Sequence, residues 1–255
     1  MTVPRIYSPE SLENKNSCAL GEDNVKYLKK VMRLKEGDRI HIFDGFGREY
    51  EATIKNFSAK SVLVDLGKAI PSVNRDISIT LAQAITKGKK MDTIVKSAAE
   101  LGADMIIPFH AVRSVSHIAD EKNPRKQTRW QKIAHEAARA SHSAYITEVT
   151  KILSFPEMLS RCSPKALKLI FWEEESRKTI KDMLTDDTLE ACGDFFIVVG
   201  PEGGFSKDEI KKTKEAGFFS VSLGRQILKV ETAATAIISI IQYEKGIFSS
   251  TSQEA

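Results

Sequence analysis

Apolar and polar residues alternate along much of the first 70 residues, a period of two that predicts β-strands. The stretch DRIHIFDGFGREYEATIKNF, residues 38–57, alternates on both sides of Gly45 and Gly47, which is typical of a β-hairpin. SVLVDLG, shortly afterwards, predicts a further strand. Residues 24–38 have helical spacing instead, so we expect one helix that ends near Gly37. Short strands with a single helix favour a small barrel-like module.

From residue 77 onwards, short apolar runs alternate with stretches of helical period. The apolar runs predict strands at ISITLAQA, DMIIPF, ALKLIFW, FFIVVG and FFSVSLG. The helical period predicts helices at residues 89–102, 124–141, 206–217 and 231–246. Strands separated by helices indicate the α/β class, with a parallel sheet and crossover helices. We therefore expect two domains, at residues 1–72 and 73–248, with a linker at 69–76.

Composition limits the class of protein. With 255 residues, 42% hydrophobic and 28% charged, the chain has the make-up of a globular protein. Its longest apolar runs are far shorter than the roughly 20 residues of a membrane-spanning helix, so no membrane partner is expected. The beginning, MTVPRIYSPE, lacks the apolar segment of a secretory signal. The three cysteines are widely spaced and the histidines show no ligand spacing, so we expect no metal and a reducing cytoplasm.

Charge is concentrated in one part of the chain. Residues 110–145 hold seven Lys and Arg against three Asp and Glu, an excess of four that equals the net charge of the whole chain. A local basic surface suits a polyanion such as nucleic acid. A solvated helix face would carry the same charges, and charge alone leaves the two interpretations equal.

Two glycine-bearing loops follow predicted strands in the C-terminal half. One is GPEGG at residues 200–204, and the other is LGRQIL at residues 223–228. In open α/β sheets ligands bind beyond the carboxyl ends of the strands, and glycine lets the backbone come close to a ligand. Neither loop matches the GxGxxG or GxxxxGK[ST] fingerprint of a nucleotide site. Either loop alone could equally be a structural turn.

Together the two loops resemble a known signature. VVGPEGGFSKDEI followed by VSLGRQILKVETAATAI resembles the SPOUT methyltransferases, and more narrowly the RsmE family of small-subunit (16S) ribosomal RNA uracil-N3 methyltransferases. LAQAITKGKKMDTIVKSAAELGADMIIPF resembles the segment that opens that family's catalytic domain, and RWQKIAHEAARAS its RNA-side helix. RIY and VMRLKEGDRIHIFDGFGREYEATI resemble its PUA-like RNA-binding module. The resemblance covers nearly all of residues 4–247.

The resemblance implies an enzyme that methylates N3 of a specific uridine in ribosomal RNA of the small ribosomal subunit. It implies a PUA-like domain at 1–72, a SPOUT domain at 73–248 with a deep trefoil knot, and a homodimer. It also implies S-adenosylmethionine as cofactor, bound in a bent shape among three loops. The carboxylate of Glu202 could brace its loop or contact the ligand. The residues implied to hold the cofactor are Phe171, Val199, Gly200, Pro201, Glu202, Gly203, Gly204, Ser222, Leu223, Gly224, Ile227, Leu228, Thr232 and Ala233.

Methylation of uracil N3 needs a proton to leave that nitrogen. A cation beside the flanking carbonyl oxygens, or a base, would assist this step. Arg225, Lys229 and Glu231 are the candidates, and helix capping is the default alternative for Glu231. Because N3 lies on the pairing face, the uridine must be unpaired or flipped, which suits a separate RNA module. Candidate RNA contacts, with exposed salt bridges as the alternative, are Arg5, Lys29, Lys30, Arg33, Arg125, Arg129 and Arg139.

The chain departs from the family's usual residues where charge matters. The family usually reads Leu-Gly-Pro-Arg-Ile-Leu-Arg where this chain has Arg225, Gln226 and Lys229 at the proline and the two arginines. Ala140 and Ser143 stand where the family usually has Gln and Arg. Lys does not replace the bidentate geometry of Arg. A SPOUT paralogue with another RNA target, and a non-catalytic RNA-binding or ribosome-assembly protein, therefore remain as alternatives.

Overall fold

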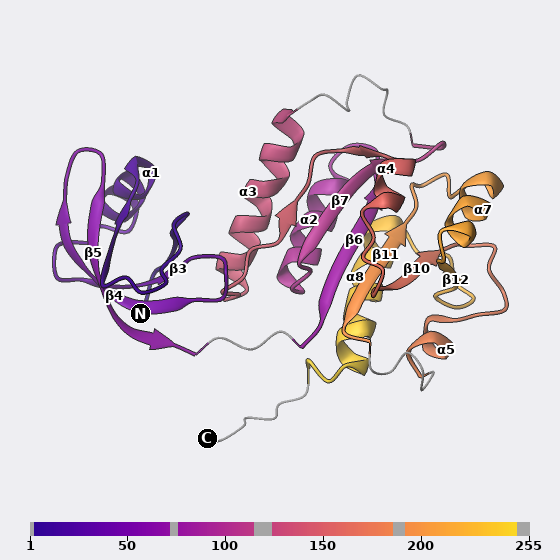
Figure 1. The fold of residues 1–255 in the computed structure, drawn as a ribbon. Helices are drawn as coiled ribbons and strands as arrows, with labels where there is room; N and C mark the ends of the chain where they lie inside the picture. Colours follow the sequence, from indigo (N-terminus) through magenta and orange to yellow (C-terminus); the bar gives the residue numbers. More distant parts are fainter. Residues whose placement is uncertain (1–2, 72–75, 115–123, 186–191, 249–255) are drawn as a thin grey trace. The chain divides into compact units, whose positions relative to one another are not determined.

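The computed structural model (Figure 1) describes residues 3–71, 76–114, 124–185 and 192–248. The chain divides into two compact units, Met1–Asn74 with Ala138–Ile146, and Arg75–Ala137 with Thr147–Ala255. The first unit thus contains a second segment, 138–146, which no sequence pattern indicated. The predicted linker and the basic stretch each lie partly outside the described residues.

The first unit is built on a five-stranded sheet in the order β1-β3-β4-β5-β2. Its strands are β1 (Arg5–Tyr7), β2 (Ser17–Leu20), β3 (Arg39–Phe43), β4 (Glu49–Phe57) and β5 (Val62–Ile70). The predicted hairpin is confirmed, because β3 and β4 pair antiparallel on either side of Gly45 and Gly47. Leu20, Ile40 and Ile54 are among the residues of its buried core. This core forms because the alternating apolar positions fall on one face of the pleat.

The predicted helix at 24–38 is shorter than expected. It consists of α1 (Glu22–Lys26), which continues into a π-helix, η1 (Tyr27–Val31). The N–H of Met32 donates to the carbonyl of Tyr27 at 3.0 Å, which is the wider π-helical spacing. Arg33 then adopts a φ of 56°, a left-handed conformation that no right-handed helix continues. The helix therefore ends several residues before Gly37.

The second unit contains a seven-stranded sheet in which every pairing is parallel. The strand order is β12-β10-β11-β6-β7-β8, and β9 also pairs with β7. The strands are β6 (Ser78–Ala84), β7 (Met105–His110), β8 (Glu148–Val149), β9 (Leu153–Ser154), β10 (Leu167–Phe171), β11 (Asp194–Val199) and β12 (Phe219–Val221). The expected α/β class with a parallel sheet is confirmed.

Helices cover both faces of the parallel sheet (Figure 1). They are α2 (Lys90–Glu100), α3 (Pro124–Ala140), α4 (Phe155–Ser160), α5 (Ile180–Leu184), α7 (Lys207–Glu215) and α8 (Val230–Glu244). Leu81 and Ile197 face a core shared with α2, α3, α5 and α8. The next residues along the strands, Ala82 and Val198, face a second core with α4 and α7. Strands buried on both faces explain why these segments read as continuous apolar runs.

Candidate functional site

The carboxyl ends of three neighbouring strands meet at one edge of the parallel sheet. Phe171 at the end of β10 is in register with Val199 at the end of β11 and with Val221 at the end of β12. The loops that follow these strands line a cavity of about 520 Å³. This edge is where open α/β sheets bind ligands, and the volume lies in the range of small-molecule sites.

The cavity brings together nearly all the residues that were expected to hold a cofactor. Only Thr232 of that set does not line it, and its side chain is exposed on α8. Ile227 is 85% exposed although it was expected to form an apolar wall. Leu228, the next residue, and Leu223, earlier in the same loop, are half-buried and line the same cavity. The loop therefore offers an apolar surface that faces solvent at the cavity.

The carboxylate of Glu202 fastens the GPEGG loop to the start of α2. It accepts hydrogen bonds from the backbone N–H of Lys87 at 3.2 Å and from Lys90 Nζ at 2.9 Å. Burial opposes ionisation, but the hydrogen bonds from Lys90 and from backbone N–H groups outweigh it and hold the pKa of Glu202 below its usual value. Of the two roles left open by the sequence, the bracing arrangement is observed, and Glu202 also lines the cavity.

Gly204 is required by both backbone conformation and space. Its φ is +66°, and a Cβ at this position would overlap Oε1 of Glu173. Glycine was expected because a ligand must come close to the backbone, but here a carboxylate of the same chain makes the close approach. The preceding residue is held as well, because Nη1 of Arg113 donates to the carbonyl of Gly203 at 3.0 Å.

Sequence reasoning missed Gln83, Lys90 and Arg113, all of which hold the GPEGG loop. Gln83 is fully buried, and its Nε2 donates to the carbonyl oxygens of Ala84 at 3.0 Å and Gly200 at 3.3 Å. Its Oε1 has no hydrogen-bond partner within the described parts of the chain. An amide near the end of the apolar run ISITLAQA was the one available signal. The sequence carried no signal for Lys90 or Arg113, because their partners Glu202 and Gly203 are distant from them in sequence.

The three candidate catalytic residues occupy different environments. Arg225 and Lys229 are exposed and line the cavity. Glu231 does not line it and lies in the first turn of α8, where its charge suits the helix dipole, as the helix-opening alternative implied. The residue before the helix, Lys229, makes no side-chain capping bond. Its Oε2 is buried and has no hydrogen-bond partner among the residues the structure describes.

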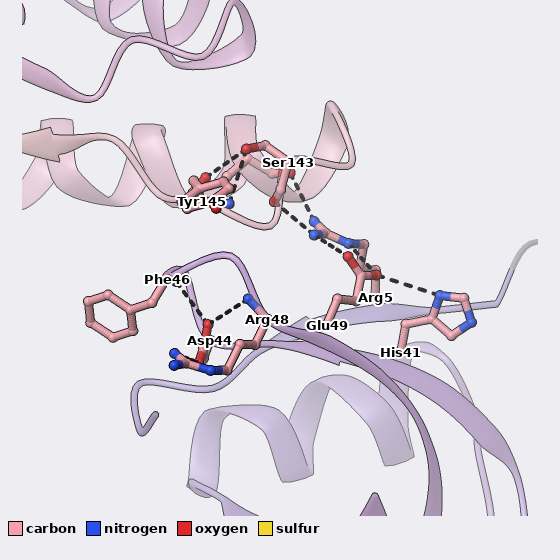
Figure 2. A network of polar contacts seen from close by, with 9 residues as sticks. Arg5, His41, Asp44, Phe46, Arg48, Glu49, Ser143 and Tyr145 are labelled. Carbon is pink, nitrogen blue, oxygen red and sulfur yellow. Dashed lines mark hydrogen bonds and ion pairs between the residues drawn. The ribbon is translucent and has the colours of Figure 1, made fainter. Parts of the chain in front are cut away.

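The expected RNA contact at Arg5 is wrong. Arg5 is only 5% exposed, and its guanidinium binds both carboxylate oxygens of Glu49, at 2.8 and 2.7 Å (Figure 2). The remaining donors reach the carbonyl oxygens of Ala138 at 3.0 Å and Ser143 at 2.7 Å. A phosphate cannot displace these partners without opening the core of the unit.

The other candidate RNA contacts lie on two helical segments. Lys29 and Lys30 on η1, and Arg33 just after it, are exposed. Arg125 and Arg129 on α3 are also exposed, and Arg129 forms an ion pair with Asp92. Arg139, at the end of α3, donates to the hydroxyl of Tyr27 at 3.4 Å. All six stay predictions.

Within the described ranges, no group of three or more His, Cys, Asp or Glu residues could hold a metal ion. The three cysteines are free thiols. The helices of the described ranges are too short or too polar to cross a membrane.

Comparisons with known proteins agree with the geometry. Residues 73–242 match the family model of an RNA methyltransferase domain, and residues 20–67 match that of an RNA methyltransferase PUA domain. The chain is 30% identical to the ribosomal RNA small subunit methyltransferase E of Bacillus subtilis, over 92% of this chain and 93% of that protein.

Solved structures give the same result. The ribosomal RNA small subunit methyltransferase E from Neisseria gonorrhoeae, bound to S-adenosylmethionine, superposes with a TM-score of 0.82 at 29% identity, over 95% and 98% of the two chains. A putative methyltransferase from Legionella pneumophila, also with S-adenosylmethionine, gives a TM-score of 0.81 at 31% identity, over 95% and 98%. The resemblance seen in the motifs is confirmed, and the chain belongs to the ribosomal RNA small subunit methyltransferase E family.

Proposed function

We propose that this protein transfers the methyl group of S-adenosylmethionine to N3 of a specific uridine in small-subunit (16S) ribosomal RNA. Two of the relatives named above, from Bacillus subtilis and Neisseria gonorrhoeae, are ribosomal RNA small subunit methyltransferases by name, and two related structures contain that cofactor. One observation of this chain carries the proposal. The residues that match the family's cofactor loops surround a cavity at the carboxyl ends of β10, β11 and β12.

The residues around the cavity fit the chemistry of this cofactor. Leu223, Ile227 and Leu228 offer apolar surface for an adenine ring. Glu173 and Glu202 also line the cavity; Glu202 is paired with Lys90, whereas the carboxylate of Glu173 would favour a ligand that carries a sulfonium and an ammonium group. When bound, S-adenosylmethionine supplies an electrophilic methyl group. The residues of the chain have to hold that group, orient it and manage the charge on uracil.

Arg225 and Lys229 are the residues placed to manage that charge. Both line the cavity with exposed side chains, so a uracil that enters from solvent would meet positive charge. A cation beside the uracil carbonyl oxygens stabilises the anion that forms when N3 loses its proton. Glu231 lies in the first turn of α8, outside the cavity lining, so we assign it no contact with the reacting atoms.

Two further features follow from membership of the family. We propose that the C-terminal loops form a deep trefoil knot, and that the enzyme acts as a homodimer in the cytoplasm. The strand order supports the knot, because β11 and β12 lie on opposite sides of β10. The chain that leaves β11 must therefore pass β10 to form β12. In a knot this return would pass through the earlier loops, an arrangement that most folds avoid.

Methylation of naked 16S RNA and of assembled small subunits by the pure protein tests the proposal. We expect one N3-methyluridine, located by mass spectrometry, and no product with Gly204→Val, whose cofactor loop is disrupted. Methylation of another RNA would favour the paralogue. Binding of S-adenosylmethionine by calorimetry without methylation of either substrate would favour the non-catalytic alternative, which Gln226 and Lys229 motivate.

A further inference from the structure

Phe46 is exposed at the tip of the hairpin between β3 and β4. Its side chain is 64% exposed, although a phenylalanine usually buries its ring. The residues on either side are Gly45 and Gly47, so neither neighbour has a side chain that could cover the ring. Figure 2 shows the ring pointing away from the polar residues that hold its loop.

The loop that carries Phe46 is fixed from within by Asp44. This carboxylate is fully buried and accepts hydrogen bonds from the backbone N–H groups of Leu12 at 3.1 Å, Phe46 at 2.8 Å and Arg48 at 3.2 Å. Charge-assisted bonds of this kind are stronger than bonds between neutral groups. The backbone of Phe46 is therefore held in one position before any partner binds.

A second segment of the same unit supports the tip from the other side. The N–H of Gly47 donates to the carbonyl of Ala144, and the N–H of Ile146 donates to the carbonyl of Gly45, both at 3.0 Å. Gly47 has a φ of +97°, and a Cβ there would lie 2.5 Å from the ring of Tyr145. The aromatic ring of Tyr145 thus packs directly on the backbone next to Phe46. The backbone of the tip is thus held on both sides, while Phe46 itself stays exposed.

We propose that the Phe46 ring stacks on an unpaired base of the RNA substrate. This inference rests on the proposed function, which requires an unpaired or flipped uridine. An exposed aromatic ring is what proteins use to stack on single-stranded bases, and a rigid support lowers the entropy lost on binding. Phe46 lies within residues 20–67, the part of the chain that matches an RNA methyltransferase PUA domain.

A protein partner fits this tip less well than a base does. A stable protein interface buries about 800 Å² on each partner, whereas Phe46 is a single ring between two glycines. A base needs only one face of such a ring. Stacking on a base releases no counterions from the RNA, whereas a phosphate contact by Lys29 or Lys30 would release them. The two kinds of contact therefore differ in how the affinity depends on salt.

Four variants at residue 46 test the proposal by RNA affinity. We expect Phe46→Ala to weaken binding of 16S RNA roughly 5- to 150-fold, the range for loss of one base stack. Phe46→Leu, the matched control, keeps apolar volume without a π-face and should also weaken binding, while Phe46→Tyr and Phe46→Trp should retain it. The dependence of affinity on salt should keep its slope in all four. Melting temperature and S-adenosylmethionine affinity should be unchanged, because the side chain is exposed.

A photo-crosslinking residue at position 46 identifies the partner directly. We expect crosslinks to a nucleotide of 16S RNA. Crosslinks to a second copy of the protein, or equal RNA affinity for the wild type and Phe46→Leu, would overturn the stacking proposal. These measurements record binding alone. A wild-type protein that binds 16S RNA but methylates no uridine would refute the proposed function, and the affinities at residue 46 would still decide the stacking proposal.

Discussion

Replacing Arg5 by leucine distinguishes a structural arginine from one that contacts RNA. The side chains of Arg5 and Glu49 are 4% and 9% exposed, and they form two hydrogen bonds with each other. Arg5→Leu would leave the Glu49 carboxylate buried without its cation. It would also remove the donors that satisfy the carbonyl oxygens of Ala138 and Ser143.

The expected loss is large because the Glu49 carboxylate stays in the core without its guanidinium partner, and Nδ1 of His41, at 3.6 Å from it, makes a longer contact than the two that are lost. Removing one partner of a buried ion pair costs about 3–5 kcal/mol of unfolding free energy. A domain of ordinary stability has only about 5–15 kcal/mol in total. The double variant Arg5→Leu/Glu49→Leu removes the orphaned carboxylate as well, so it should recover part of the loss. Lys55→Met breaks an exposed pair with Asp65 in the same unit and should cost about 1 kcal/mol or less.

Urea unfolding followed by two signals measures this effect. Trp130 and Trp172, the two tryptophans of the chain, both belong to the second unit, so their fluorescence reports on that unit. Circular dichroism reports on both units. We expect Arg5→Leu to move a circular-dichroism transition to lower urea. A loss below about 1 kcal/mol, together with a tenfold loss of RNA affinity, would refute the buried pair and restore Arg5 as a phosphate contact.

Three further predictions concern the cofactor loop and the thiols. The pKa of Glu202 is lowered in the folded protein, so its ionised carboxylate stabilises the loop fully at pH values above 4.5, the ordinary pKa. This stabilisation is lost as the pH falls through the lowered pKa. Glu202→Gln should therefore reduce the acid dependence of cofactor affinity measured by calorimetry. Gly204→Val should weaken S-adenosylmethionine binding at least tenfold, because its side chain meets Glu173. Burial raises the pKa of Cys18 and of Cys162 to about 11, so iodoacetamide at pH 8 should alkylate both far more slowly in native than in unfolded protein.

Each of these expectations has a contradicting result. An unchanged acid dependence in Glu202→Gln would show that another group titrates. Wild-type cofactor affinity in Gly204→Val would mean that the loop can move away from Glu173. Native alkylation of Cys162 at the unfolded rate would show that its thiol is not held in a desolvated environment.

Sequence patterns were sufficient where one element carries the signal by itself. The long strands and helices of the second unit occur at the predicted positions, because buried faces repeat with the period of each element. The Ser206–Glu209 capping box at the start of α7 is a local signal of the same kind, since both partners lie within one turn. The sequence did not reveal β8, β9, α4 and α5, because elements of two to six residues are too short to show a repeating pattern of apolar positions.

Contacts between distant residues could not be predicted from local patterns. Arg5 appeared to be an exposed cation near the start, and only the pairing of β1 with β3 and of β3 with β4 brings Glu49 to it. The Lys90 partner of Glu202 is 112 residues away in sequence. The sequence therefore pointed, through their glycines, to two loops that line one cavity, but it did not reveal what holds them.

Three carboxylates hold the loops at the two proposed sites, and they act on the backbone. Asp44 accepts three backbone N–H bonds at the hairpin tip, and Glu202 accepts one from Lys87. Glu209, only 3% exposed, accepts from the N–H groups of Val112 and Ser206, behind the GPEGG loop. A loop that meets a ligand cannot be covered by apolar packing on its outer side, so its N–H groups need partners from within. Carboxylates provide them, and the loops are consequently ordered before a ligand binds, which lowers the entropy cost of binding at both proposed sites.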